Sequence, residues 1–415
     1  MLFEALRKAL LKDIGRGLVA PVLRLELAQL RLLPFHGTAS QRLLAEAGLE
    51  LSYRAFAGRE PVILTSLFTP PELFHALGLV PFGLEPAGAG AASLGLVPRA
   101  LAAAERAWAP ADACTILRAG LGVGHLGLLP RPLAAVSTSC LCDSTPKALA
   151  AAARLSGARF RLLDVPYTAS PAALAYLAAQ FEALAHDLAQ WAGRRLDPAS
   201  LAEALQLSNQ AREHLLAINA LRRIHPGVLG AGEALGFLYP ISLLLGSPDG
   251  ARVFQAYRAD LTAAAQTLPQ PSGPRVLWLH IMPFYPHSLV EALERAGACI
   301  VFEEMSQVFW PALDPARPYE SLARRCLDHF ANGPLQRRLA ALLALVQDYR
   351  IDGAVHFSHH GCRQSWGSLQ VIRDALANVG VPLLELEGDC ADPRNRGQGQ
   401  QYTRLQAFVE TLEVK

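Results

Sequence analysis

The sequence predicts an α/β protein with two sheet-containing lobes. Short apolar runs typical of buried strands alternate with helical runs in two separate stretches of the chain. Between those stretches the strand pattern stops, and two long helical runs take its place. The chain has 415 residues, of which 52% are hydrophobic and 18% charged, and this is enough for sizeable cores in two or three domains.

The first half of the chain begins with helical patterns and continues as alternating strands and helices. Apolar residues recur at helical spacing over 6–32 and 43–49. A helix is expected after the pair Pro70-Pro71, a typical helix start, and another over 143–156, which is Ala-rich and ends at Gly157. Strands are expected at 61–67, 79–84, 133–137 and 160–165. This alternation predicts a parallel, doubly wound sheet.

The second half begins with two long helices, expected over 172–191 and 200–223, where apolar residues recur every three to four positions. After a Pro/Gly-rich linker the alternation resumes, with strands expected at 276–280, 299–302, 354–357 and 383–386 and a last helix at 400–412. We therefore predict an N-terminal helical extension (1–55), a first α/β lobe (56–168), a helical insert (169–268) and a second α/β lobe (269–415). Each lobe would be an open parallel-sheet unit of the flavodoxin- or Rossmann-like kind.

Charge and hydropathy exclude several classes of function. The 38 basic and 36 acidic residues give a formal charge of +2 and do not cluster, so nucleic acid is not an expected partner. No run reaches the roughly 18 apolar residues of a membrane span, and the charged start of the chain is a poor secretory signal. We expect a soluble, cytoplasmic protein without a membrane partner.

The seven cysteines are an odd number in a long chain without an export signal, which argues against a disulfide framework. They are left as buried filler, nucleophiles or metal ligands. Cys299 starts an expected strand and Cys326 lies within an amphipathic helix, and we expect both to be filler in the core or at the surface.

Three other cysteines stand where α/β proteins build sites. Cys142 and Cys362 each follow an expected strand and precede a helix, and Cys114 lies in a small-residue segment expected to open a short helix. Free N–H groups and the helix dipole favour thiolate at such positions. Thiolates select iron–sulfur clusters, zinc or copper(I), but the short paired spacing typical of zinc is missing. Inert buried cysteines remain the alternative.

Two further cysteines and two histidines adjoin these positions. Cys140 and Cys142 flank one leucine, so in a strand end both could face one metal centre, or one could point into the core. Cys390 follows an expected strand. His359 and His360 immediately precede Gly361-Cys362, which invites a metal or proton-transfer role, with a solvated loop as the alternative. His280 and His287 flank another strand-to-helix loop and leave the same choice open.

Common nucleotide and hydrolase motifs do not apply. The segment Gly122–Gly127 matches GxGxxG, but a dinucleotide site needs a helix after it, and Pro130 and Pro132 exclude a helix there. The sequence has no GxxxxGK[ST] loop, no GxSxG elbow and no HExxH pair.

With these residues in view, the sequence resembles the iron–sulfur subunits of the 2-hydroxyacyl-CoA dehydratase and benzoyl-CoA reductase family. The resemblance covers most of the chain, from Val62-Ile-Leu-Thr-Ser66 and the Cys142-Asp143 turn to a dense tail. That tail contains His359-His-Gly-Cys-Arg-Gln-Ser-Trp-Gly367 and Glu387-Gly-Asp-Cys-Ala-Asp-Pro-Arg-Asn395.

The resemblance implies a [4Fe–4S] cluster held by Cys114, Cys142 and Cys362, with the fourth iron open to a small ligand or a substrate carbonyl. It also implies an acyl-CoA substrate that reacts through a ketyl radical. A separate ATP-dependent iron–sulfur activator protein would supply the electron, and the subunit would work beside a second homologous subunit or as a homodimer. Ser66 and Glu85 fall near the segment where family members place a substrate-contacting serine and a carboxylate, whereas Glu72 is expected to be a first-turn helix residue.

Cys140 and Cys390 exceed the three-cysteine pattern. Extra thiolates resemble a branch of the family that carries a double-cubane cluster and reduces small molecules, and in that case both would join the ligands. A second alternative is a non-catalytic electron-relay or cluster-scaffold subunit.

Overall fold

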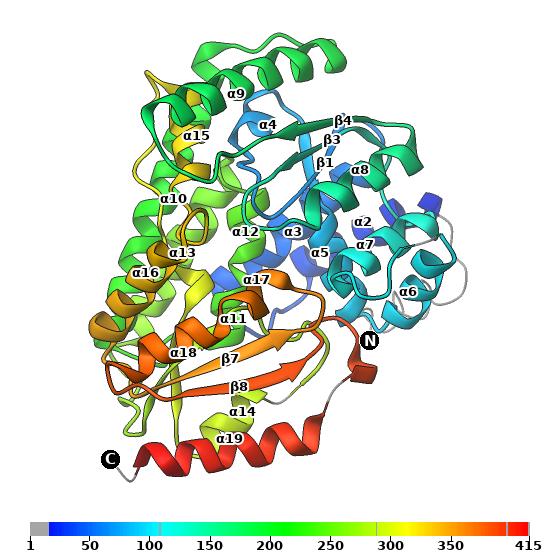
Figure 1. Ribbon diagram of the computed structural model, residues 1–415. Helices are drawn as coiled ribbons and strands as arrows, with labels where there is room; N and C mark the ends of the chain where they lie inside the picture. The colour runs from blue at the N-terminus through cyan, green and yellow to red at the C-terminus, as the bar shows by residue number, and fades with distance from the viewer. Residues whose placement is uncertain (1–15, 108, 288, 396, 414–415) are drawn as a thin grey trace.

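The computed structural model describes residues 16–107, 109–287, 289–395 and 397–413, and it confirms the α/β class with two lobes. In these parts of the chain there are two four-stranded sheets, and every strand pair in both sheets is parallel. Figure 1 shows the first sheet above the second, with helices packed around both.

The first sheet has the strand order β2-β1-β3-β4. Its strands are β1 (Val62–Thr65), β2 (Val80–Gly83), β3 (Pro132–Thr138) and β4 (Arg159–Leu163). Each lies where the apolar pattern predicts a strand. Every residue of β1 is buried, as expected for a central parallel strand covered on both faces.

The second sheet repeats this arrangement with the order β6-β5-β7-β8. Its strands are β5 (Arg275–Leu279), β6 (Cys299–Glu303), β7 (Gly353–His359) and β8 (Leu383–Gly388). The strand β7 is fully buried and runs two residues further than the sequence predicts, so that His359 is its last residue. In each lobe the first strand therefore lies between the second and the third.

Most of the rest of the described chain is helical, with loops between the elements. Before the first sheet lie η1 (Arg16–Leu18), α2 (Val19–Leu32) and α3 (Ala39–Phe56). The first lobe contains α4 (Glu72–Ala76), α5 (Leu84–Ser93), α6 (Val97–Arg106), α7 (Thr115–His125) and α8 (Thr145–Ser156). Between the sheets come α9 (Pro171–Ala192), α10 (Pro198–Ile224), α11 (Ala231–Gly236), α12 (Leu238–Leu243) and α13 (Pro248–Ala264). The second lobe adds α14 (Leu289–Arg295), η2 (Glu304–Ser306), α15 (Pro318–Leu327), α16 (Leu335–Tyr349), α17 (Arg363–Gly367), α18 (Leu369–Ala377), η3 (Pro393–Asn395) and α19 (Gln398–Glu413).

Local sequence explains where several of these helices begin and end. Ser170 caps α9 by accepting a hydrogen bond from the backbone N–H of Ala173, and Gly193 ends the helix in the left-handed conformation. Thr38 and Gln41 form a capping box at α3. The helix expected before residue 16 lies outside the described residues. None of the helices in the described ranges has the length and apolar character needed to cross a bilayer.

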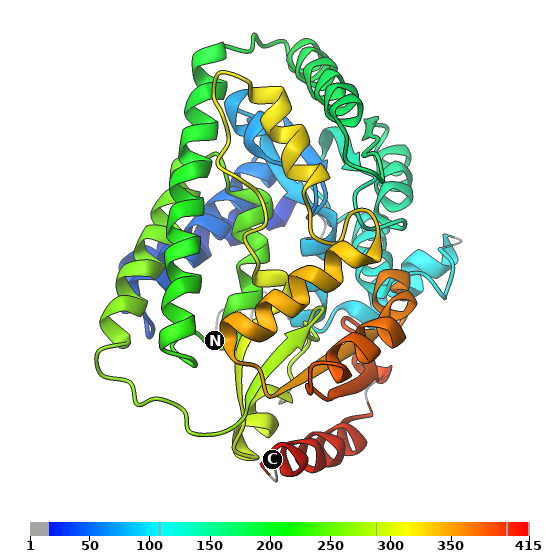
Figure 2. The ribbon, with the colours of Figure 1, turned by 60° about the vertical axis from the view of Figure 1, so that its left-hand side comes forward.

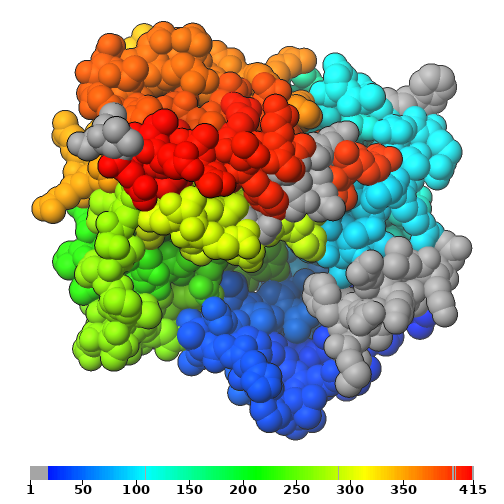
Figure 3. Space-filling view, turned by 90° about the horizontal axis from the view of Figure 1, so that it is seen from below, coloured from blue at the N-terminus to red at the C-terminus, as the bar shows by residue number. Residues whose placement is uncertain are grey.

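The long helices that lie between the two sheets in the sequence also connect the two lobes in space. Helix α10 contacts α4 in the first lobe and β6 in the second, and it packs along α13. Figure 2 shows α10 and α13 running side by side along one edge of the molecule. At the opposite end, α19 lies across the second lobe beside α14, as the view from below shows (Figure 3). The domain boundaries expected from the sequence remain a prediction.

Glycines allow α7 to pack directly against its neighbours. A Cβ at Gly122 would come within 1.9 Å of the Ala100 carbonyl oxygen on α6, and a Cβ at Gly88 on α5 within 2.0 Å of the Ile116 carbonyl oxygen. The segment that matches GxGxxG is therefore a helix-packing surface, which agrees with its rejection as a dinucleotide motif. This close packing joins α7, at whose N-terminus Cys114 lies, to α5 and α6.

A buried ion pair joins α10 to the second sheet. Arg222 donates to both carboxylate oxygens of Glu303, at 2.8 and 2.9 Å, and both side chains are almost fully buried. Glu303 is the last residue of β6. Since a buried charge without its partner is strongly unfavourable, this pair constrains how α10 meets the sheet.

We expect Arg222→Ala to reduce the free energy of unfolding by about 3–5 kcal/mol, because it leaves Glu303 charged and buried. The neighbouring Arg223 pairs with Asp348 at the surface, so Arg223→Ala is a matched control that should cost below about 1 kcal/mol. Urea titration followed by circular dichroism measures both values. Equal losses in the two variants would contradict this account of the Arg222 pair.

Candidate cysteine site

The strand order places a site-forming edge in each lobe. Where the first and third strands of a parallel sheet are neighbours, their following loops diverge and leave a crevice at the carboxyl ends. A cavity of about 460 Å³ lies at these ends, between the lobes. Leu67 after β1 and Cys142 after β3 line it from the first lobe, and His280 after β5 and Cys362 after β7 line it from the second.

The structure brings Cys114, Cys142 and Cys362 to this one cavity. All three are half-buried, and each precedes a helix: Cys114 is the N-cap residue of α7, Cys362 is the N-cap residue of α17, and Cys142 lies just before α8. Burial raises the pKa of the Cys362 thiol to about 11, and it raises the pKa of Cys114 and Cys142 as well. Without a bound cation the thiols therefore stay protonated, and a metal centre would have to displace their protons.

Direct contacts hold the three cysteine loops together. Next to Cys362, Arg363 pairs with Asp143 at 2.9 Å and the Gln364 amide donates to the Leu141 carbonyl at 2.8 Å, so both residues that flank Cys142 are engaged. On the other side, a Cβ at Gly361 would come within 2.9 Å of the Cys114 backbone nitrogen. Gly361 also has φ +79°, so glycine satisfies both the conformation and the close approach.

Two of the three described non-glycine residues with positive φ lie at this site, the third being Arg350 at the end of α16. Leu141 has φ 63° and His280 has φ 69°, the left-handed region that non-glycine residues rarely adopt. Each of these residues lines the cavity beside a cysteine. Strained residues persist where the surrounding structure holds them, and they are enriched at functional sites.

Two histidines contact the thiols. Nε2 of His359 lies 3.3 Å from Sγ of Cys114, and Nε2 of His280 lies 3.5 Å from Sγ of Cys362. Burial lowers the pKa of His359 to about 4 and that of His280 well below its ordinary value, so both rings are neutral near pH 7. His360 is exposed, stacks on Trp366 and does not line the cavity, and neither does His287.

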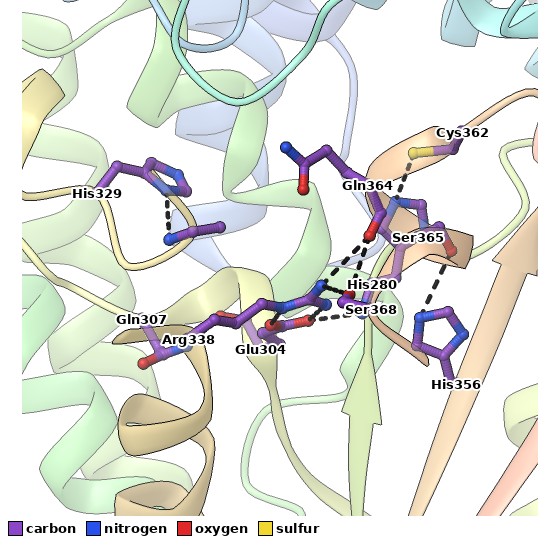
Figure 4. Close-up of polar contacts among 11 residues, drawn as sticks. His280, Glu304, Gln307, His329, Arg338, His356, Cys362, Gln364, Ser365 and Ser368 are labelled. Atoms are coloured by element: carbon purple, nitrogen blue, oxygen red, sulfur yellow. Dashed lines mark hydrogen bonds and ion pairs between the residues drawn. The ribbon is translucent and has the colours of Figure 1, made fainter. Parts of the chain in front are cut away.

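A buried ion pair forms the floor of the site on the side of the second lobe (Figure 4). Arg338 from α16 donates to both carboxylate oxygens of Glu304 through Nε and Nη2, at 2.6 and 2.8 Å, and its Nη1 donates to the Ser368 hydroxyl at 2.7 Å. Burial alone would raise the pKa of Glu304, but Arg338 outweighs it and holds this pKa below its ordinary value. Glu304 also accepts from the His280 backbone N–H at 3.2 Å, so the pair orients the loop that presents His280 to Cys362.

The carboxyl group of Glu85 lies at the cavity on the side of the first lobe. Oε1 accepts a hydrogen bond from the Thr145 hydroxyl at 3.0 Å, while Oε2 is buried without a hydrogen-bond partner in the described structure. Burial raises the pKa of Glu85 to about 7, so this group can hold or release a proton near neutral pH. Ser66 is buried behind the cavity wall and bonds Thr69 at 2.8 Å, so it does not line the cavity.

The structure does not bring Cys140 and Cys390 to the cavity. Cys140 points into the first lobe's core, where Sγ contacts the Cys326 carbonyl at 3.7 Å, and burial raises its pKa to about 12. The idea that it shares a face with Cys142 needed extended backbone, but β3 ends at Thr138 and Leu141 turns the chain. Cys390 is fully buried in the second lobe's core, behind His359. Cys299 and Cys326 also lie away from the cavity.

Sequence reasoning missed Arg338 and Glu304, and it treated Glu72 only as a helix-start residue. Glu304 directly follows β6, so its position at a strand end was a usable signal. Arg338 lies within an amphipathic helix, and no local pattern separates it from the neighbouring, half-buried Arg337. Glu72 does begin α4, and it also forms a buried ion pair with Arg325 and accepts from Ser208 at 2.6 Å.

In the ranges that the structure describes, no group of three or more His, Cys, Asp and Glu side chains is arranged to hold a single metal ion. This finding concerns ligands that converge on one ion. In a cubane cluster each thiolate binds its own iron, so the sulfurs stand farther apart. Soft thiols are the donors of iron–sulfur clusters and of zinc rather than of magnesium, and the lack of convergence on one ion in the described residues disfavours a mononuclear zinc site.

Fold and site together define a two-lobed α/β protein with a thiol-lined cavity between parallel sheets. Comparison with known families agrees with that class of protein and identifies the family. The family model of the 2-hydroxyglutaryl-CoA dehydratase D-component matches residues 66–412. The chain belongs to this family, which confirms the resemblance found in the sequence.

Characterised relatives are distant in sequence. The chain is 23% identical over 267 residues to the alpha subunit of (R)-phenyllactyl-CoA dehydratase from Clostridium sporogenes, covering 61% of this chain and 64% of the relative. It is 21% identical over 268 residues to the alpha subunit of (R)-2-hydroxyglutaryl-CoA dehydratase from Acidaminococcus fermentans, covering 61% and 54%. One of the benzoyl-CoA reductase subunits from Thauera aromatica is 29% identical over 103 residues, 25% of this chain and 24% of that one. The matches thus span less than two thirds of these relatives' length.

The raised pKa of Glu85 predicts a specific pH dependence of stability. Between about pH 4.5 and 7 the unfolded chain loses this proton while the folded chain keeps it, so the folded state loses stability as the pH rises. A shift from 4.5 to about 7 corresponds to a loss of about 3 kcal/mol, complete above pH 7. Glu85→Gln removes this loss. Urea unfolding of metal-free protein should therefore show the variant gaining on the wild type between pH 4.5 and 8, and a constant difference would contradict the assignment.

Proposed function

We propose that this chain is the iron–sulfur component of a 2-hydroxyacyl-CoA dehydratase-like lyase and that Cys114, Cys142 and Cys362 hold a [4Fe–4S] cluster. The observation that carries the proposal is the convergence of these three thiols, from three separate helix starts, on one cavity at the strand ends of both lobes. Membership of the dehydratase family supports the reaction class.

The residues present fit such a cluster. The donors are soft, they come from three loops that contact one another, and they line a cavity of about 460 Å³. Three cysteines for four irons leave one iron open, and when bound the cluster would supply a site that is both a Lewis acid and an electron donor. Binding would release the protons that the buried thiols otherwise keep.

The chain's own residues supply a dry, shaped cavity and a proton-handling group. Apolar side chains from both lobes and from α11 and α12 form most of its wall and limit access of water to the reacting centre: Leu67, Phe68, Leu235, Leu238, Ile281, Phe284, Met305 and Phe330. Glu85 faces the same cavity with one free oxygen and a pKa of about 7, so we assign it the proton transfer of dehydration. Ser66 would act through the β1 loop rather than by touching substrate.

The proposal includes partners. Relatives are named as alpha subunits and the family as a D-component, which supports assembly with a second homologous subunit or a second copy of this chain. An ATP-dependent iron–sulfur activator protein would supply the electron for ketyl-radical chemistry on an acyl-CoA, and the reducing cytoplasm would keep the thiols free. A double-cubane reductase is less well supported, because Cys140 and Cys390 do not line the cavity.

Anaerobically purified protein should contain about four iron and four sulfide per chain. Alanine at Cys114, Cys142 or Cys362 should remove most of both, while Cys299→Ala is the matched control and should keep them. Iron and sulfide analysis, together with visible absorption spectra, measures the cluster content of each protein. A wild-type chain without iron would refute the proposal, and about eight iron per chain would favour the double cubane.

The charges on the cavity wall indicate the kind of acyl group. The cations among the lining residues are Arg338, which is bound by Glu304, and Arg363, which pairs with Asp143 at the exposed rim. No other described lining residue offers a cation to a second carboxylate on the acyl chain. A bulky apolar acyl group therefore fits this cavity better than a dicarboxylic one.

Without an activator the protein should bind 2-hydroxyacyl-CoA thioesters without turnover. We expect phenyllactyl-CoA to bind at least about tenfold more tightly than 2-hydroxyglutaryl-CoA, since an unpaired buried carboxylate costs more than about 1.4 kcal/mol. Anaerobic calorimetry measures both affinities. Met305→Arg should reduce the difference in affinity between the two thioesters, compared with the matched variant Met305→Gln, because it adds a cation to the cavity wall. If the wild type bound 2-hydroxyglutaryl-CoA as tightly as phenyllactyl-CoA or more tightly, the inferred preference for an apolar acyl group would be wrong.

A further inference from the structure

We propose that His359 is held as the neutral tautomer with its proton on Nε2, that it donates an N–H···S hydrogen bond to Cys114, and that this bond raises the reduction potential of the cluster. His359 is thus a positioning residue rather than a proton-transfer group. The part that concerns the potential rests on the proposed function, whereas the hydrogen bond itself does not.

The tautomer follows from the two partners of the ring. The backbone N–H of Cys390 points at Nδ1 of His359 at 3.1 Å. A backbone amide can only donate, so Nδ1 must accept and carries no hydrogen. In a neutral ring the proton then lies on Nε2, which is 3.3 Å from Sγ of Cys114. The sulfur is therefore the acceptor.

A closed ring of contacts fixes this geometry. The Cys390 amide lies in a loop organised by Asp389, whose Oδ1 accepts from the backbone N–H groups of Ala391 and Asp392, each at 2.8 Å. The same Oδ1 accepts from the hydroxyl of Thr115 at 2.6 Å, and Thr115 directly follows Cys114. The group that sets the tautomer and the sulfur that receives the proton are thus tied to one carboxylate.

The histidine itself cannot turn away. His359 is 1% exposed, it ends the fully buried strand β7, and its carbonyl accepts from the indole N–H of Trp366 at 3.1 Å. His280 provides a contrast at Cys362. Its Nδ1 has no backbone amide at hydrogen-bonding distance comparable to the Cys390 N–H at His359, according to the hydrogen bonds of the described structure.

A hydrogen bond to a cluster thiolate withdraws electron density from the sulfur. The reduced cluster carries one more negative charge than the oxidised one and gains more from the donor, so the potential rises. For a component that must accept an electron from a partner, this bond eases the transfer. It also fixes the Cys114 side chain in the direction of the cavity.

Two substitutions separate the functions of the two ring nitrogens. In His359→Gln the amide nitrogen can reach the position of Nε2 and donate to Cys114. In His359→Asn the shorter amide can still accept from Cys390 at the position of Nδ1, but it cannot reach the sulfur. Both remove the imidazole, so a loss of ring packing affects them alike.

The test is a redox titration of the anaerobic holoprotein monitored by electron paramagnetic resonance, together with ¹⁵N NMR of the histidines in metal-free full-length chain. We expect His359→Asn to keep its iron and shift the midpoint potential to more negative values, and His359→Gln to stay closer to the wild type in its potential. In the wild type, His359 should show the Nε2–H tautomer.

Equal potentials in all three proteins, or an Nδ1–H or doubly protonated ring, would overturn the proposal. If His359→Asn loses its cluster, its potential cannot be compared, and the tautomer seen by NMR in the metal-free wild type then tests the proposal. If the wild type binds no iron, the proposed function fails, and the NMR result still tests the hydrogen bond.

Discussion

The carboxyl ends of four parallel strands meet at one cavity, and the rest of the site depends on this constraint. In each sheet the first strand lies beside the third, so the loops after β1, β3, β5 and β7 open onto a crevice. The two crevices face each other across the lobe interface. Residues more than two hundred positions apart, such as Asp143 and Arg363, are thereby brought within bonding distance.

Polar groups inside the protein hold this arrangement in place. Arg222–Glu303 and Arg338–Glu304 use neighbouring carboxylates at the end of β6 to bind α10 and α16. Breaking one partner of a buried pair is costly, so each pair restricts how its helix can move against the sheet. In the first lobe small residues fix the helices against one another, because the glycines of α5 and α7 let backbones approach closely. The cysteine loops are therefore mounted on rigid supports.

The ionisable residues around the cavity differ in their protonation states near pH 7. Burial keeps the thiols protonated and the histidines neutral, while Glu85 titrates near neutral pH. The one buried guanidinium on the wall, among the residues that the structure describes, is fully engaged by Glu304 and Ser368. Such a site offers soft ligands, a titratable proton and an apolar surface, which is the chemistry on which the proposed function rests.

The sequence by itself determined the α/β class, the positions of the strands and the three cysteines at helix starts, because apolar periodicity and turn residues are local signals. It could also rank Cys299 and Cys326 as filler. It could not decide between Cys140 and Cys142, since the left-handed turn at Leu141 depends on contacts with the other lobe. Arg338, the tautomer of His359 and the burial of Ser66 behind the cavity wall likewise depend on partners distant in sequence. Only the tertiary structure decides these features, because a side chain's direction and protonation are set by its neighbours in space.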